Sequence, residues 1–150
     1  MNLTQADAFN LFLLLSIFLI GFPLMGAALA RFCNWKGLVQ ECTSSTNVGI
    51  AENFRFQSIA VSYRRGIYVK FGQLCRVSLD QSSIVISCYF PFSISFQPIC
   101  ILWTELAKIE HEGKWIPITI LHHSNGGHRI AVGGKLAQAI EENFRKRSAG

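Results

Sequence analysis

The sequence predicts one membrane-spanning helix followed by a small α+β domain, in which an antiparallel bent sheet or partial barrel is capped by a C-terminal amphipathic helix. Three observations predict this arrangement. Residues 9–30 form an uncharged apolar run, residues 54–132 contain short β-type runs separated by turn residues, and residues 134–147 change to a helical period. The expected organisation is a tail over residues 1–8, the span over 9–30, a juxtamembrane helix and linker over 31–49, and a β-rich domain over 50–150.

The apolar run at residues 9–30 is long enough to cross a bilayer. About 20 apolar residues span a hydrocarbon core of about 30 Å, at about 1.5 Å per residue. The run contains no charge and no polar face at helical spacing. Its Pro23 is compatible with lipid, where local adjustment re-satisfies the freed backbone groups. The run therefore predicts a transmembrane helix rather than the buried helix of a soluble core.

A cleaved signal peptide is the alternative, because Ala28-Leu29-Ala30 has the small-x-small form of a cleavage site. The run is longer than the roughly 7–15 apolar residues of a signal sequence. The residues before it include Asp7 but no Lys or Arg, so a basic leader is missing from this segment. Both features favour a retained helix.

Basic residues beside the span set the expected orientation. No Lys or Arg precedes the run, whereas Arg31 and Lys36 follow it closely. The positive-inside rule then predicts a single span, with the N-terminus outside and the C-terminal domain in the cytoplasm.

Small residues occupy the C-terminal half of the span, at Gly21, Gly26, Ala27 and Ala30. Small side chains let membrane helices approach closely, so these positions are candidates for packing against another helix. Gly and Ala also occur in spans that pack against nothing.

Residues 31–42 are expected to continue as a short helix at the membrane surface. Phe32 and Trp35 are three residues apart and would share a face near the interface, where amphipathic aromatic rings settle. Arg31, Trp35 and Lys36 are therefore candidate membrane-surface contacts. The alternative for Trp35, equally supported, is that it packs on the domain.

Eight runs rich in Ile, Val, Phe and Tyr read as strands because turn residues separate them. They cover residues 54–63, 66–71, 73–79, 84–90, 99–103, 107–112, 115–121 and 128–132. A second kind of turn signal, Ser124-Asn125-Gly126-Gly127, predicts a hairpin because its glycines tolerate positive φ.

One hairpin can be predicted residue by residue. The polar turn at residues 80–83 places Leu79 opposite Ile84, Val77 opposite Ile86, and Cys75 opposite Cys88. All these positions are apolar, and a shift by one residue would oppose apolar to polar side chains. Two free thiols in the core are expected for the cysteine pair, since a disulfide between adjacent strands is usually strained.

The last element changes period. Leu136, Ile140 and Phe144 recur every four residues, which predicts an amphipathic helix. The basic run at residues 145–147 ends it and interacts favourably with the negative end of the helix dipole.

This order of elements resembles the pleckstrin-homology-like fold, including its bacterial versions. Between Trp35 and Phe144 the chain also resembles a group of small uncharacterised bacterial proteins. The resemblance is carried by residues 35–38, 74–77, 84–87, 101–106, 129–130 and 135–137. It implies the fold and a bacterial inner-membrane location, and it brings no activity and no catalytic residues.

Catalysis is not expected. The five cysteines contain no Cys-x-x-Cys pair, and the four histidines lack the further ligands that a stable zinc site needs. The sequence has no P-loop, dinucleotide fingerprint or nucleophile elbow. We therefore predict no enzyme activity, no cofactor and no metal.

The charge pattern leaves two classes of interaction. The chain carries a net charge of +5, and all of its Lys and Arg residues follow the span. The favoured hypothesis is an accessory or assembly subunit of a larger membrane protein complex, for example a respiratory or photosynthetic one. The alternative is a module that senses an anionic lipid or ligand, using Arg64, Arg65 and Lys70. Nucleic acid is not an expected partner because no reader motif is present.

Overall fold

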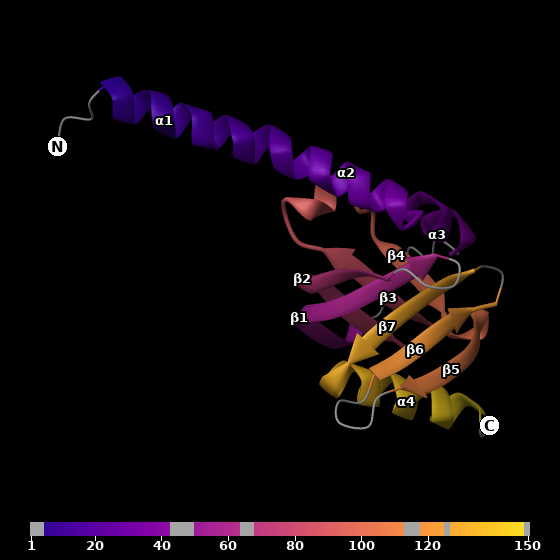
Figure 1. Cartoon of the computed structure of the whole chain (residues 1–150). Helices are drawn as coiled ribbons and strands as arrows, with labels where there is room; N and C mark the ends of the chain where they lie inside the picture. Colours follow the sequence, from indigo (N-terminus) through magenta and orange to yellow (C-terminus); the bar gives the residue numbers. More distant parts are fainter. Residues whose placement is uncertain (1–4, 43–49, 64–67, 113–117, 125–126, 149–150) are drawn as a thin grey trace.

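The computed structural model describes residues 5–42, 50–63, 68–112, 118–124 and 127–148. A long N-terminal helix lies over one end of a curled β-sheet, and the C-terminal helix lies at the opposite end (Figure 1). The predicted linker at residues 43–49 falls outside the described residues.

The apolar run forms a nearly continuous helix. Its segments are α1 (Gln5–Ser16), the π-helical turn η1 (Ile17–Gly21) and α2 (Phe22–Phe32). The wide turn ends at Gly21, two residues before Pro23. Pro23 has no backbone N–H to donate, and its ring crowds the preceding turn. Within it, the stretch Ala6–Phe32 is long and apolar enough to cross a membrane.

A sharp corner follows α2. Asn34 adopts the left-handed conformation, with φ of 50°, and its carbonyl accepts a hydrogen bond from the Leu38 N–H at 3.1 Å. Helix α3 (Trp35–Glu41) begins there. Because of this corner, Phe32 remains exposed while Trp35 is buried. The prediction that these two rings share one face was therefore wrong.

Seven antiparallel strands form one curled sheet, in the order β4-β3-β2-β1-β7-β6-β5. Their bounds are β1 (Ile50–Tyr63), β2 (Tyr68–Asp80), β3 (Ser83–Cys88), β4 (Ile99–Leu102), β5 (Leu106–Glu112), β6 (Ile118–His123) and β7 (His128–Gly133). The pairing of β1 with both β2 and β7 joins the two halves of the sheet.

The first predicted hairpin has the expected register. Cys75 pairs with Cys88, Val77 with Ile86, and Leu79 with Ile84. The apolar members of these pairs are all buried. β6 and β7 also pair as expected, although residues 125–126 of their turn are not described.

The two runs at residues 66–71 and 73–79 belong to one strand rather than two. Gly72 lies inside β2, and Gln73 follows it with φ of 53°. Opposite them, the β1 register shifts around Gln57. The residues that resemble a turn in sequence therefore form a β-bulge, which bends both strands without separating them.

The domain core extends beyond the strands at both ends. Helix α4 (Gly134–Ser148) buries Leu136, Ala137 and Ile140 against β6 and β7, as its period predicts. At the other end, Trp35 and Leu38 of α3 join the core cluster. The core therefore includes residues well upstream of residue 50.

Candidate functional site: a basic pocket where helix and domain meet

A pocket of about 480 Å³ opens where α2, α3 and the loop between β3 and β4 meet. It lies at the end of the apolar helix, on the same end of the domain as α3 (Figure 1). Its lining residues are Ala30, Arg31, Asn34, Trp35, Lys36, Val39, Ile94, Ser95 and Gln97.

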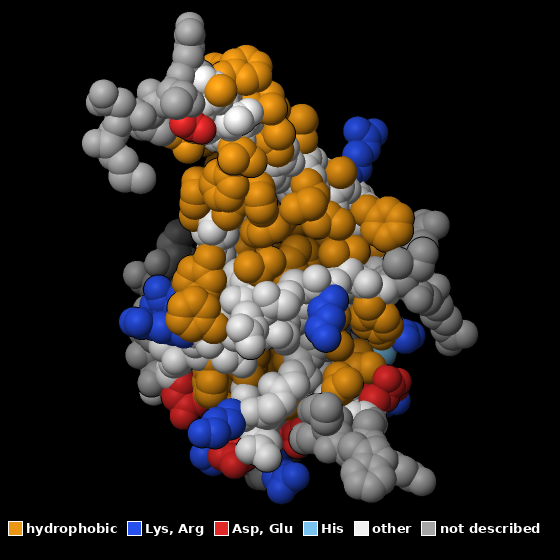
Figure 2. Space-filling view, turned by 60° about the vertical axis from the view of Figure 1, so that its left-hand side comes forward, with side chains coloured by type: hydrophobic (Ala, Val, Ile, Leu, Met, Phe, Trp, Pro, Cys, Tyr) orange, Lys and Arg blue, Asp and Glu red, His pale blue; other side chains and the backbone are white. Residues whose placement is uncertain are grey.

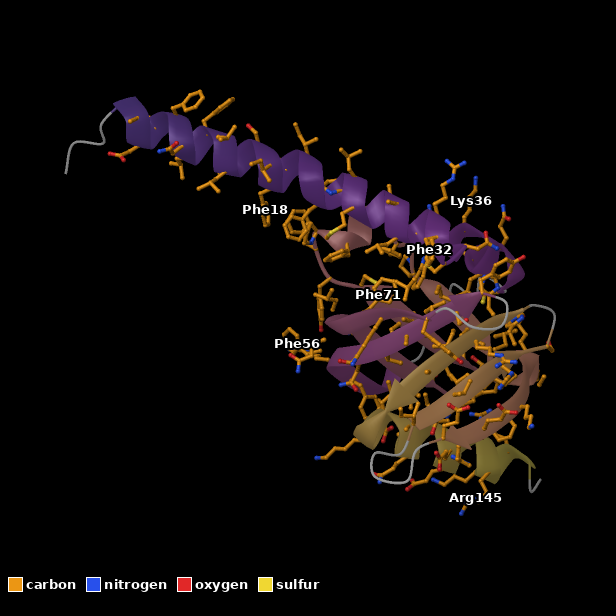
Figure 3. All side chains as sticks on the ribbon, viewed as in Figure 1. Phe18, Phe32, Lys36, Phe56, Phe71 and Arg145 are labelled. Carbon is orange, nitrogen blue, oxygen red and sulfur yellow. The ribbon has the colours of Figure 1, made fainter. Side chains whose placement is uncertain are left out.

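The corner between the helices assembles this pocket. Arg31 is in the last turn of α2 and Lys36 is near the start of α3, and both are exposed. The left-handed Asn34 turns the chain between them. Two cations separated by five positions in sequence therefore line one cavity. Figure 3 shows Lys36 on the side of the helical corner that faces away from the sheet.

Trp35 forms the inner wall of the pocket and is only 2% exposed. Its indole N–H donates a hydrogen bond to the Gln97 carbonyl at 2.9 Å. Its ring meets Phe71 and Phe96 edge-on, with centroids 5.7 and 5.0 Å away. Trp35 therefore packs on the domain, and its assignment as a membrane-surface contact was wrong because the core supplies both its apolar and its polar partners.

The described lining of the pocket combines two cations with polar groups. Arg31 and Lys36 supply positive charge, while Asn34 and Gln97 supply polar groups. Among the described lining residues there is no carboxylate, histidine or thiol.

The small residues of the span have different surroundings. Gly26 is buried against the chain's own β3–β4 loop, where an added Cβ would lie 3.0 Å from the Ser95 Oγ. Gly21 and Ala27 are exposed, and Ala30 is half-buried at the pocket. Gly26 thus allows a close approach of the kind expected of small residues, but to a loop of this chain.

The remaining predicted cations lie elsewhere. Lys70 is exposed on β2, pairs with Ala60 through the backbone, and does not line the pocket. Arg64 and Arg65 fall outside the described residues.

Sequence reasoning missed the polar part of the pocket, because Ser95 and Gln97 are more than 50 positions from the helix that they meet. Asn34 carried a usable signal, since Asn is enriched among residues with positive φ. Nothing local distinguishes Ser95 or Gln97 from ordinary loop residues.

A charged cluster lies on β5 and β6. The Glu110 carboxylate accepts from the Lys108 ammonium at 2.6 Å and contacts the His122 ring at 2.9 Å. These partners, Lys108 first, hold the pKa of Glu110 below its ordinary value. Among the described residues, no group of three His, Cys, Asp or Glu is placed to hold a metal ion.

The buried cysteine pair is reduced in the structure. The Cys75 and Cys88 sulfur atoms are 3.6 Å apart. Their hydrogen bond and their removal from water raise the pKa of Cys75. The raised pKa disfavours the reactive thiolate of Cys75, and both buried side chains fill the core as small apolar groups.

The curled seven-stranded antiparallel sheet with a C-terminal helix across one end defines a pleckstrin-homology-like domain, here preceded by an apolar helix. A similar solved structure is described as the Vps36 N-terminal PH domain, with a TM-score of 0.50 at 12% sequence identity. The match covers 72% of this chain and 87% of that chain. At this identity the likeness establishes the fold alone.

No protein-family model matches the sequence, and no curated protein matches it. The resemblance to the small bacterial proteins therefore stays a prediction, while the pleckstrin-homology-like fold is confirmed.

Proposed function

We propose that this chain is a membrane-anchored, non-catalytic interaction module that serves as an accessory or assembly subunit of a larger membrane protein complex. The expected setting is a bacterial inner membrane, with the N-terminus outside and the β domain in the cytoplasm. A respiratory or photosynthetic assembly is one example of such a complex.

The main support for this proposal is the close packing of the apolar helix against the β domain. The Phe22 ring meets the Phe92 ring at 6.0 Å, the Ser95 hydroxyl donates to the Pro23 carbonyl at 3.3 Å, and Trp35 ties α3 into the core. A domain joined in this way keeps one orientation relative to its anchor. A fixed orientation suits the presentation of a surface to a neighbour in the same membrane, and a covalent span makes reversible recruitment by lipid unnecessary.

The side of α2 that faces away from the domain is available to such a neighbour. Leu24, Met25, Ala27 and Ala28 are exposed there. Small residues between larger apolar ones let a second helix pack closely. This face is the expected contact with the partner's membrane helices.

Co-purification from native membranes tests the proposal. A C-terminally tagged full-length chain, extracted in mild detergent, is expected to bring down a stoichiometric membrane protein that mass spectrometry identifies. Ala28→Phe should reduce the recovery of that partner, whereas Ala8→Phe, an equally small and exposed residue near the other end of the helix, should not. Recovery of the chain alone, under conditions that keep other membrane complexes intact, would contradict the subunit role.

The basic pocket favours a second candidate, the binding of an anionic lipid headgroup. Arg31 and Lys36 lie just beyond the apolar helix, at the level where headgroups are found. Native mass spectrometry of the purified chain should then detect retained phosphatidylglycerol. The variant Arg31→Gln/Lys36→Gln should lose it, and Arg145→Gln/Lys146→Gln, with the same charge change, should not. Lys36 and Arg145 lie at opposite ends of the molecule (Figure 3).

A further inference from the structure

The apolar helix is free of the domain over only part of its length. From Phe22 onward, the β3–β4 loop covers one of its faces, with Gly26 buried and Leu29 half-buried. The free part, residues 6–21, extends about 24 Å at 1.5 Å per residue. A bilayer core is about 30 Å thick, so the free part alone is too short to cross it upright.

The uncovered face of α2 is apolar from Leu24 to Ala28, as a surface within the bilayer must be, whether lipid or a partner helix lies against it. Leu24 is 65% exposed and Phe32 is 60% exposed, and the first cation after the span is Arg31. The apolar requirement of this helix therefore extends along α2 as far as Ala30, one residue before Arg31. Whatever packs on the opposite face of α2 lies at the same depth in the membrane.

The β3–β4 loop is what packs there, and its chemistry suits lipid. Residues 89–98 contain no charged side chain. Phe92 and Phe96 are buried beneath the loop, whereas Phe90 is 68% and Ile94 is 61% exposed. Figure 2 shows the hydrophobic surface of the helix continuing onto the adjoining end of the domain, while most Lys, Arg, Asp and Glu side chains in that view lie farther from the helix.

Several backbone N–H groups of the loop are also hydrogen-bonded within the loop itself. The N–H groups of Ser93, Ile94, Ser95 and Phe96 all donate to carbonyls within the loop, at 2.9–3.3 Å. The Ser95 hydroxyl donates to the Pro23 carbonyl. Unsatisfied polar groups are what exclude irregular segments from lipid, and this loop satisfies these groups internally.

We propose that the β3–β4 loop is a second membrane-inserted element. Phe90 and Ile94 enter the acyl-chain region of the leaflet beside α2. The β domain is then partly embedded in the bilayer and does not lie wholly in the aqueous phase. Arg31 and Lys36 then lie at the headgroups. This inference rests on the membrane anchoring proposed above, and it adds the bilayer itself as a partner of the β domain.

Photolabelling from within the bilayer tests the insertion. The full-length chain is placed in vesicles of phosphatidylcholine and phosphatidylglycerol that contain a phospholipid with a diazirine in its acyl chain. After irradiation and trypsin digestion, adducts are expected on the peptide of residues 1–31 and on that of residues 77–108, at positions 90–94. The peptide of residues 136–145 in α4 should remain unlabelled.

The three peptides separate the possible outcomes. Labelling of residues 1–31 without residues 77–108 would show that the helix is in lipid and the loop is not, which overturns the insertion alone. Absence of labelling from both would overturn the anchoring and the insertion together. Equal labelling of the α4 peptide would mean that the reagent reports surface exposure, and would also count against insertion.

A matched pair of variants tests whether the labelling of residues 77–108 depends on the apolar side chain of Ile94. Ile94→Asp should reduce labelling of residues 77–108 several-fold while leaving that of residues 1–31 unchanged. Ile118→Asp is the control, because Ile118 is also an exposed isoleucine but pairs with Gly133 next to α4, remote from the helix. Circular dichroism checks that both variants fold. Unchanged labelling in Ile94→Asp would contradict the proposal.

Discussion

At the scale of single residues, positive φ angles mark positions where the fold depends on which residue type is present. Gly134 starts α4 directly after β7 with φ of 65°. No atom lies within 4 Å of the position that a Cβ would take there. Asn34, Phe56 and Gln73 adopt similar angles at the helical corner and at the β-bulge. Asn34 and Gly134 turn the chain between elements, whereas Phe56 and Gln73 bend β1 and β2 from within. Only glycine adopts such angles without steric cost.

Gly134→Ala should destabilise the protein. An L-residue in the left-handed region costs about 1–2 kcal/mol, and the lower entropy of the unfolded chain returns about 0.4–1 kcal/mol of that. A net loss of roughly 1 kcal/mol is expected in denaturant unfolding of the detergent-solubilised chain. The control is Gly72→Ala, where φ is not positive and no atom lies within reach of the added carbon. Equal destabilisation by both variants would refute the role of the backbone angle.

One cluster of charged side chains lies on the surface of β5 and β6. Glu110 is held ionised by Lys108 and His122, and all three side chains lie on the sheet and not in the pocket. The low pKa of Glu110 therefore reflects surface pairing. Exposed ion pairs of this kind contribute little to stability.

At the scale of elements, the contact between α2 and the β3–β4 loop determines how the anchor meets the domain. Gly26 permits this contact because it has no side chain, and Ser95 occupies the space that one would take. The loop is held in shape by its own backbone hydrogen bonds and by the burial of Phe92 and Phe96. The helix and the domain consequently share one continuous core.

Gly26→Leu should separate the loop from the helix. A Cβ at this position would already lie 3.2 Å from the Ser95 Cβ, and a leucine side chain has no space at all. Hydrogen–deuterium exchange should accelerate at the amides of residues 93–96. Ala27→Leu places the same side chain on the exposed face of the helix and should leave their exchange unchanged. Protection of these amides in Gly26→Leu would show that the contact is not essential to the loop.

At the scale of the whole molecule, charge asymmetry across the apolar helix determines the expected orientation. Asp7 is the only charged side chain before the apolar run at residues 9–30, and Arg31 and Lys36 follow the run. Two cations form a weak signal by the positive-inside rule. The same two cations line the pocket, so orientation and headgroup binding would depend on shared residues.

The orientation can be measured with C-terminal reporters. A fused green fluorescent protein should fluoresce, and fused alkaline phosphatase should be inactive, because the C-terminus is expected in the cytoplasm. The variant Asp7→Lys/Arg31→Gln leaves one cation on each side of the apolar run, which removes the local charge difference, and should yield a mixed population. Arg145→Gln, far from the helix, should not. Active phosphatase on the natural sequence would place the β domain outside.

The sequence alone determined those features that depend on neighbours along the chain. The length of the apolar run, the register of Cys75 with Cys88, and the four-residue period of α4 all follow from local patterns of apolar and polar residues. The order of these elements resembles that of the pleckstrin-homology-like fold, and the structure confirms that fold with seven strands in place of the eight predicted runs.

Only the tertiary structure decided which surfaces meet. Trp35 had an equally good place at the membrane surface or in the core, and its burial follows from Phe71, Phe96 and the Gln97 carbonyl, all distant in sequence. Gly26 was a candidate for contact with another helix, and the space beside it is filled by Ser95. Apolar periodicity specifies that a face will be buried, but not against what, because any close-packed apolar partner stabilises it equally well. That choice depends on the whole folded chain.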